Sequence, residues 1–289
     1  MHRYIALLKI AEIGSFTKAA EVLGYTQPAI SQLIASLEKE LSIKLLTRSR
    51  YGISLTPEGE RLLPSIQSTV SQYQSMMNLA DEIRGLDSGV IRIGTISSIS
   101  CHWLPVVIKK FWEKHPHIQL IVHQGDYTTI PRWVHDGEID FGFVSSEAVS
   151  QIDKDFLKFG EHRACVPQNH PLAAQRTVTL EELTKEPFLL LEEGVFSEVL
   201  EAFKKQNLEP DIRMTMHDDY SILSMVEKGL GVTILPELVL KKQSYNIKML
   251  PVEPMIYRKI GIISRNKNEL SLAAKTFINF LKDSKEELL

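Results

Sequence analysis

Residues 14–41 constrain the fold most, because they hold two apolar-periodic segments of helical spacing that are separated by only a short turn. Ser15 is placed to cap the first of these helices, and Gly24 is placed to end it. Thr26 is placed to cap the second helix, with Pro28 in its first turn, where the missing N–H costs nothing. Two short helices joined by a turn that contains glycine form a helix-turn-helix.

The polar residues at the start of the second helix predict contact with double-stranded DNA. In a helix-turn-helix, the first residues of the second helix enter the major groove. Gln27, Ser31 and Gln32 lie on its polar face, where glutamine can pair with adenine and serine with several base edges. Pro28 can contact a thymine methyl group, and Thr26 suits a phosphate at the helix N-terminus. For Gln27 or Ser31 taken alone, a helix face that only meets water is the alternative.

A basic segment after these helices supports the same interpretation. Arg48 and Arg50 lie in residues 45–55, a stretch typical of a small β-hairpin wing, from which they can reach phosphate or the minor groove. Residues 1–61 hold more basic than acidic side chains, although the chain of 289 residues has a net charge of -3. With a further helix expected over residues 4–13, the N-terminal region is predicted to bind DNA.

Residues 56–86 are predicted to form one long helix that mediates self-association. Apolar residues recur along it in alternating steps of four and three, the spacing of a coiled-coil seam. The seam consists of Leu62, Ile66, Thr69, Tyr73, Met76, Ala80 and Ile83. A single helix cannot bury such a stripe alone, so we expect a homodimer; packing on its own C-terminal domain is the alternative. Pro64 inside the helix is expected to cost ~3 kcal/mol or to kink it.

Beyond a boundary at residues 87–89, the pattern changes to alternating strands and helices. We expect strands at 90–96, 118–123, 139–144, 165–166, 188–191, 212–216, 232–235 and 259–264, and helices at 104–114, 129–136, 197–206, 220–228 and 270–282. Such alternation is typical of an α/β fold class with a mostly parallel sheet. Because the units come in two batches, we expect two lobes with a ligand between them at strand ends.

The N-terminal motifs resemble the LysR-type transcriptional regulator family. The matching segments are residues 14–21, 26–32, 37–38 and 55–59. The resemblance implies a winged helix-turn-helix with base contacts from Gln27, Pro28, Ser31 and Gln32 and a wing contact from Arg48 or Arg50. Two departures stand out: Leu46 and Thr47 replace the family's frequent phenylalanine before its arginine, and Gln32 stands where a basic residue is common.

The C-terminal region is similar to the family's effector domain, which resembles type 2 periplasmic binding proteins. The matching segments are residues 136–142, 170–173 and 229–236. The resemblance implies a DNA-binding domain at 1–58, a dimerisation helix at 59–88, and an effector-binding domain at 89–289. It further implies one lobe at about 90–163 plus 267–289 and another at about 164–266, and dimers that pair into a homotetramer.

A small-molecule effector is expected in the loops that follow strands. In the first lobe these loops hold Ser97, Ser98, Ser100 and Thr128, whose hydroxyl groups suit an anion. The second lobe offers Glu193 and His217 at corresponding strand ends. Ser98 and Thr128 are the first choices, although each residue can equally be a cap or a turn. The acidic residues Asp126, Glu193 and Asp218 favour an effector that bears an amino group over a simple dicarboxylate.

No catalytic residue, metal ligand or cofactor is expected, because no nucleotide-binding, hydrolase or metalloprotease motif occurs in the sequence. The main rival is an enzyme that carries a DNA-binding head, and the second is an exported solute-binding protein. Cys101 and Cys165 are too few and too far apart for a disulfide framework. A redox-sensing thiol at Cys101 is a less favoured alternative to a packed residue. Without an apolar run of ~18 residues we expect no membrane span and a cytoplasmic protein.

Overall fold

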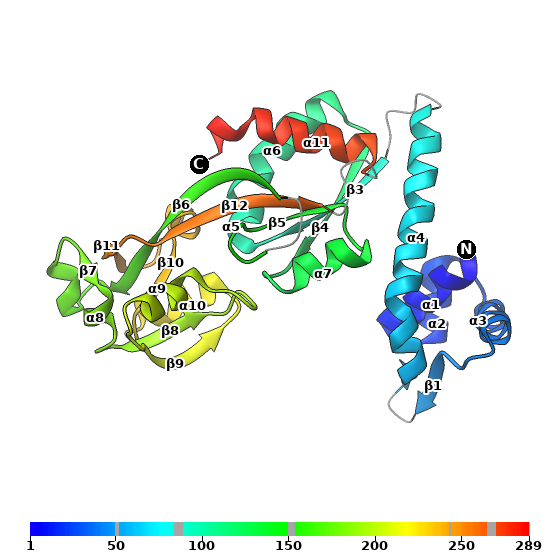
Figure 1. Ribbon diagram of the computed structural model, residues 1–289, viewed down its shortest axis with the longest axis horizontal. Coiled ribbons are helices and arrows are strands. Elements are labelled where there is room, and N and C mark those ends of the chain that lie inside the picture. The colour runs from blue at the N-terminus through cyan, green and yellow to red at the C-terminus, as the bar shows by residue number, and fades with distance from the viewer. Residues whose placement is uncertain (50–51, 84–88, 150–153, 243, 265–269, 289) are drawn as a thin grey trace. The chain divides into compact units, whose positions relative to one another are not determined.

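The computed structural model describes residues 1–49, 52–83, 89–149, 154–242, 244–264 and 270–288, and its elements are labelled in Figure 1. Residue contacts divide the chain into two compact units. The first is Met1–Leu86 with Asp136–Glu138, and the second is Asp87–His135 with Ile139–Leu289. The mixture of helices and sheets confirms the expected α/β fold class.

The first unit opens with three helices: α1 (His2–Ile13), α2 (Phe16–Leu23) and α3 (Gln27–Leu41). Their ends confirm the predicted caps, because the hydroxyl of Ser15 accepts the N–H of Lys18 at 3.4 Å and that of Thr26 accepts the N–H of Ala29 at 3.4 Å. Gly24 ends α2 with φ at 70°, a conformation that favours glycine. The helices share a core of Ala6, Leu7, Ile10, Phe16, Ala19, Ala20, Ile30, Ile34, Leu37 and Leu45.

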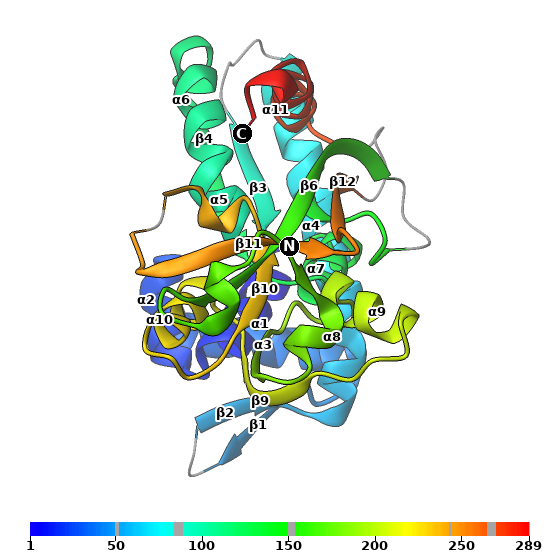
Figure 2. The ribbon, with the colours of Figure 1, turned by 90° about the vertical axis from the view of Figure 1, so that its left-hand side faces the viewer.

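The predicted wing is a two-stranded antiparallel hairpin of β1 (Leu46–Ser49) and β2 (Gly52–Leu55). Figure 2 shows it extending beyond the three helices. Glu38, a buried residue of α3, ties the helix to the wing: its carboxylate accepts the N–H groups of Leu45 at 2.9 Å and Leu46 at 3.3 Å and pairs with Lys44 at 2.6 Å. Burial raises the pKa of Glu38, but these partners outweigh it and hold the pKa below its ordinary value.

Helix α4 (Pro57–Ile83) is the expected long helix, and it continues through Pro64. The beginning of the predicted seam has an unexpected use, since Ile66 is buried in the helix-turn-helix core and Leu62 packs against that core. That end of the seam therefore stabilises its own domain, whereas Met76 further along is 55% exposed. Gly59 makes the close approach possible, because a Cβ there would lie 2.4 Å from the carbonyl oxygen of Leu45.

The first lobe of the second unit is built on parallel strands that a returning strand extends. β3 (Gly89–Thr95) runs parallel to β4 (Ile118–Gln124) and β5 (Phe141–Ser145), and β12 (Tyr257–Ser264) pairs antiparallel with β5. The helices α5 (Ser97–His102), α6 (Leu104–Lys114), α7 (Thr129–Asp136) and α11 (Leu272–Asp283) contribute apolar side chains to the core of this lobe. Its largest buried side chains include Phe111, Phe141 and Phe277.

Two long strands connect the lobes. β6 (Lys154–Pro167) pairs with β12 over its first part and with β10 (Thr233–Pro236) and β11 (Ile247–Glu253) over its second part. In Figure 1, β6 and β12 run side by side from one lobe into the other. The second lobe also holds β7 (Val178–Thr179), a separate parallel pair of β8 (Pro187–Leu191) and β9 (Asp211–Met216), and the helices α8 (Leu180–Leu183), α9 (Glu198–Lys205) and α10 (Asp219–Glu227).

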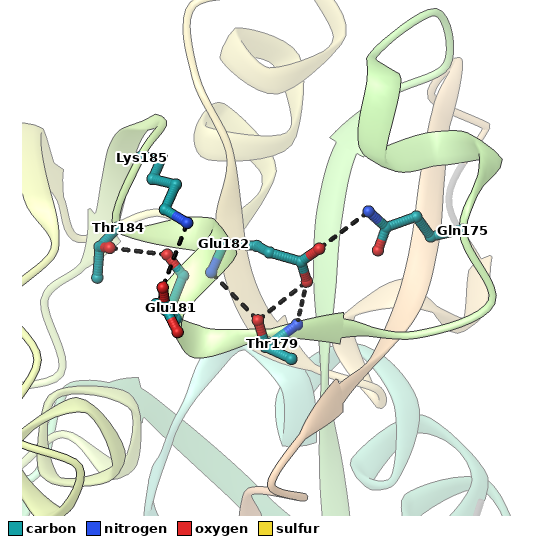
Figure 3. A network of polar contacts seen from close by, with 6 residues as sticks. All are labelled: Gln175, Thr179, Glu181, Glu182, Thr184 and Lys185. Atoms are coloured by element: carbon teal, nitrogen blue, oxygen red, sulfur yellow. Dashed lines mark hydrogen bonds and ion pairs between the residues drawn. The ribbon is translucent and has the colours of Figure 1, made fainter.

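A local network fixes the start of α8 (Figure 3). Thr179 and Glu182 form a capping box, in which each side chain bonds to the other residue's backbone N–H, at 3.2 and 2.8 Å. Gln175 donates to the second oxygen of Glu182 at 3.0 Å. The N–H of Thr179, followed by these side-chain donors, lowers the pKa of Glu182. This short helix therefore has a sequence signal at its start, although it was not predicted.

Four expectations about the second unit are corrected. The sheet was expected to be mostly parallel, but it is mixed, because β12 pairs antiparallel with β5 and β6, and β6 pairs antiparallel with β10 and β11. The strand expected at 165–166 is the end of the much longer β6, and β11 was not expected at all. Residues 97–102, expected as a loop, form α5, which begins at Ile96 without any side-chain cap to signal it. Strand β12 contributes to both lobes rather than to the second alone, because Ile260 and Ile262 pack in the core of the first lobe although they lie in the range 164–266 expected for the second.

Candidate functional site

The start of α3 presents a polar face that is held in place from behind. Gln27, Pro28 and Gln32 are exposed, and Ser31 is half-buried. On the opposite side of the helix, Ile30 is fully buried in the domain core. The hydroxyl of Thr26 serves as the helix cap at the same end. The packing therefore fixes the direction in which the exposed face points, as a DNA-reading helix requires.

The wing residues are only partly described by the structure. Arg48 lies in β1, opposite Ile53 of β2. Arg50 lies outside the described residues. Their proposed phosphate contacts therefore rest on the position of the hairpin and on the sequence.

A cavity of about 430 Å³ lies in the second unit where four strands end. Parallel strands β3 and β4 end there in the first lobe, and parallel strands β8 and β9 end there in the second. The lining residues are Ile96, Ser97, Ser98, Gln124, Gly125, Asp126, Thr129, Trp133, Leu191, Glu192, Glu193, His217, Asp219 and Arg258. This position, at the carboxyl ends of strands, is where ligands bind in open α/β sheets.

The structure brings together some of the predicted effector residues and not others. Ser97, Ser98, Glu193 and His217 line the cavity, whereas Ser100 and Thr128 are not among its lining residues. The hydroxyl of Ser100 instead donates to the carbonyl of Ser97 at 2.9 Å.

Thr128 has a different role, because it joins the two lobes. Its hydroxyl accepts the N–H of Val195 at 2.9 Å, and beside it the N–H of Tyr127 donates to the carbonyl of Glu193 at 2.9 Å. Gly194 permits this contact: its φ is 93°, and a Cβ there would lie 2.4 Å from the Thr128 hydroxyl oxygen. The lobes are therefore bonded to each other at the edge of the cavity.

Arg258 is the central residue of a hydrogen-bonded group at the cavity, and we call it the hub. Its side chain is buried, and its guanidinium donates to the Tyr127 hydroxyl at 2.6 Å and to Glu193 at 2.9 Å. A third donor lies 3.5 Å from the hydroxyl of Ser98. Because Arg258 is in β12, which passes between the lobes, these bonds connect the crossing strand to both of them.

The carboxyl groups around Arg258 are strongly perturbed. Burial raises the pKa of Glu193 to about 8; Arg258 opposes that rise, and Glu198 and Asp219 add to it. Burial likewise raises the pKa of Asp219, which accepts a hydrogen bond from the hydroxyl of Ser97. Buried ionisable groups with shifted pKa values in a cavity indicate a functional site.

Two further residues near Arg258, namely Asp126 and His162, have lowered pKa values. Asp126 accepts the N–H groups of Thr128 at 2.8 Å and Thr129 at 2.7 Å, and these bonds outweigh burial and lower its pKa. His162, buried on β6, has its pKa lowered to about 3 by burial and by the charge of Arg258, so its ring is neutral at pH 7. Asp218 caps α10 and is not a lining residue, whereas its neighbour Asp219 lines the cavity.

Sequence reasoning missed Arg258 and Asp219. Arg258 carried a signal, because it shares a strand face with Ile260 and Ile262, and an arginine on an apolar face implies buried partners. Asp219 carried no such signal, since two aspartates in a row at a helix start do not show which one caps the helix.

The described part of the chain contains no group of three or more His, Cys, Asp or Glu residues arranged to hold a metal ion. Cys101 is exposed and Cys165 is buried, and burial raises the pKa of the Cys165 thiol to about 12. Among the described helices, none combines the length and the apolar character needed to cross a membrane.

Comparison with known families identifies both units. Residues 1–60 match the family described as "Bacterial regulatory helix-turn-helix protein, lysR family", and residues 84–286 match the family described as "LysR substrate binding domain". The chain therefore belongs to the LysR family of transcriptional regulators.

Individual relatives match over nearly the whole chain. The HTH-type transcriptional regulator YvbU of Bacillus subtilis is 32% identical over 279 residues, which cover 96% of this chain and 95% of YvbU. The transcriptional dual regulator GltC of Bacillus subtilis is 32% identical over 260 residues, which cover 88% of this chain and 86% of GltC. Full-length CbnR in complex with its target DNA has the same fold, with a TM-score of 0.73 and 20% identity, over 98% of this chain and 99% of CbnR.

Proposed function

We propose that this regulator reads paired half-sites on double-stranded DNA through the start of α3 and the wing. The base-reading residues are Gln27, Pro28, Ser31 and Gln32, with Thr26, Arg48 and Arg50 at phosphate or in the minor groove. The exposure of this polar face over a fully buried Ile30 supports the assignment. A helix fixed in this way can enter the major groove without repacking its domain.

A small-molecule effector, bound between the two lobes, regulates DNA binding. One observation carries this proposal: the residues that follow four strands, distant in the sequence, line one cavity of about 430 Å³. That volume suits a small metabolite. Ser97, Ser98, Glu193 and His217 are proposed to contact the effector. Its binding alters the bonds between the lobes and thereby the spacing of the DNA-binding heads, a coupling typically worth ~1–3 kcal/mol.

The remaining assignments follow from the same organisation. The proposed domains are 1–58 for DNA binding, 59–88 for dimerisation through α4, and 89–289 for effector binding. Homodimers that pair into a homotetramer place several heads on one operator. The protein acts in the cytoplasm as a regulator and catalyses no reaction on its effector.

Capture of sheared DNA from the source organism tests the first half of the proposal. The purified full-length chain is expected to retain a few sites with interrupted two-fold symmetry at moderate salt. Uniform retention that disappears with added salt would show only non-specific binding and overturn the proposal. Once a site is known, footprints with and without candidate effectors test the second half.

A further inference from the structure

We propose that the effector is a small organic cation with a primary amine, held between the lobes by Asp219 and Glu193. This inference rests on the proposed function, because it assigns a chemical class to the ligand of the same cavity. The reasoning comes from the charges that line the cavity, from the partners already taken by its cationic residue, and from the hydrogen-bonding capacity that is left.

Acidic groups outnumber basic ones around the cavity. Among the described lining residues, the carboxylates are Asp126, Glu192, Glu193 and Asp219, and the only basic side chains are Arg258 and His217. The His217 side chain is 72% exposed and lies 3.6 Å from Glu192, which offsets its charge when it is protonated. A ligand that brings a second negative charge into this space would meet net repulsion.

Arg258 is already engaged by protein partners through three of its five N–H groups. Its donors already bond to Tyr127 at 2.6 Å and to Glu193 at 2.9 Å, with Ser98 at 3.5 Å. A ligand carboxylate would have to share the guanidinium with Glu193 and would add a further negative charge beside that buried group.

A further carboxylate lies behind this arrangement. Glu198 is 4% exposed, and within the described part of the chain neither of its oxygens has a hydrogen-bond partner. Its charge acts on Glu193, Tyr127 and Arg258, so it belongs to the same electrostatic cluster. One buried guanidinium thus serves Glu193, Glu198 and Asp219 together. A buried cluster in which three carboxyl groups share one cation gains from a second cation, which would let Glu193 release the proton that its raised pKa retains.

The residues around the cavity also offer hydrogen-bond acceptors for an ammonium group. An ammonium has three donors and no acceptor. Asp219 has one oxygen engaged by Ser97, and Glu193 has one engaged by Arg258. The side-chain carbonyl of Gln124 can accept the third bond, and the Trp133 ring offers an aromatic surface to the rest of the ligand. At Asp126, the N–H groups of Thr128 and Thr129 both bond to one oxygen, Oδ1, and hold that carboxylate at the turn before α7.

Calorimetric titration of the full-length chain at pH 7 tests the proposal. The probes are 1,4-diaminobutane, benzylamine and agmatine, each compared with a carboxylate of similar size, namely succinate, benzoate and glutarate. At least one amine is expected to bind with measurable heat, and its matched carboxylate is not. Binding of a carboxylate in place of the amines, or failure of all three amines, would overturn the inference.

A matched pair of variants locates the bound amine. Asp219→Asn keeps an acceptor for Ser97 but removes the charge, and should weaken amine binding at least about tenfold. Asp211→Asn makes the same chemical change at an exposed position of β9 in the same lobe and should leave the affinity unchanged. Equal affinities in both variants would show that the amine binds elsewhere and would overturn the assignment.

The same amine added to a footprint on the captured DNA separates this inference from the proposed function. If the amine binds and the footprint does not change, the cation site stands and regulation through the cleft fails. If a carboxylate changes the footprint while amines do not, regulation stands and the cation assignment fails.

Discussion

The DNA-reading face and the ligand cavity are assembled in opposite ways. The candidate DNA contacts at the start of α3 come from one short segment; Gln27, Pro28 and Gln32 are exposed, Ser31 is half-buried, and none of them is charged. The cavity collects residues from four strand ends and a crossing strand, and its central groups, Arg258 and Asp219, are 4% and 3% exposed. Substitutions in the two regions should therefore act on different quantities: recognition at the first and stability at the second.

The largest effect is expected from Arg258→Met. Removing the guanidinium leaves Glu193, Glu198 and Asp219 buried without their cation, at a cost of roughly 3–5 kcal/mol in the unfolding free energy of the α/β domain. Denaturant unfolding followed by tryptophan fluorescence measures this cost. All three tryptophans, Trp103, Trp112 and Trp133, lie in the first lobe of that domain, so the fluorescence reports on the α/β domain and not on the DNA-binding head.

Arg213→Met provides the control for this experiment. Arg213 is also on a strand, but its side chain is 67% exposed and pairs with Asp211 at the surface, so the loss should stay within about 0.5 kcal/mol. Similar losses in the two variants would show that the hub contributes no more than a surface ion pair.

The next effect is a dependence of stability on pH. The pKa of Glu193 is raised to about 8 in the folded state, so the folded domain holds this proton more tightly than the unfolded chain. The stability that this proton contributes is complete below the ordinary pKa of 4.5 and is lost as the pH rises towards 8. The free energy of unfolding of the wild type, measured relative to Glu193→Gln, should therefore fall between those values.

The comparison with Glu193→Gln cancels other titrations. His162, whose folded pKa is lowered to about 3, acts in the opposite direction below pH 6.5, but it does so in both proteins. The groups that face Glu193 are Arg258, Tyr127, Glu198 and Asp219, and all are retained in the variant. A constant difference across the range would mean that folding does not shift the pKa of Glu193.

A smaller effect is expected in the head from Glu38→Gln. The amide keeps an acceptor for the N–H groups of Leu45 and Leu46 but loses the charge paired with Lys44, so roughly 1–3 kcal/mol of head stability should be lost. Circular dichroism at 222 nm during thermal unfolding measures it. Glu21→Gln, an exposed change on α2, should have no effect. If both variants unfold alike, the tie between α3 and the wing is not stabilising.

The fold of the DNA-binding head, residues 1–58, was predictable because its determinants are local. The caps at Ser15 and Thr26 and the glycine at 24 each act within a few residues, and the structure shows both caps and the left-handed glycine. The use of Ile66 was not predictable in the same way. Its heptad position suits a partner helix and its own domain equally well, and only the close approach at Gly59 decides where the start of α4 packs.

The cavity was predictable in location but not in composition. Strand ends mark where a ligand binds in an α/β sheet, and Ser97, Ser98 and Glu193, which were expected in the loops that follow strands, line the cavity. Which residue of a loop faces inward depends on the turn that the loop makes. Thr128 points to Val195 across the lobes, and Asp219 rather than Asp218 reaches the cavity. Such choices depend on contacts between residues that are distant in the sequence.

The smallest effect on stability, and the most specific one on recognition, is expected from Gln32→Ala. Gln32 is exposed, so its loss should leave the unfolding free energy unchanged within about 0.5 kcal/mol. Binding to the captured operator should weaken by roughly 1–3 kcal/mol and tolerate other bases at one position.

Arg50→Ala, a wing change outside the described residues, should instead weaken all sequences alike and flatten the dependence of affinity on salt. Affinities measured on operators substituted base by base, at two salt concentrations, distinguish these outcomes. If Gln32→Ala leaves every base preference intact, α3 does not read the major groove through this residue. The contrast between a face that acts on recognition and a cavity that acts on stability would then fail for the face.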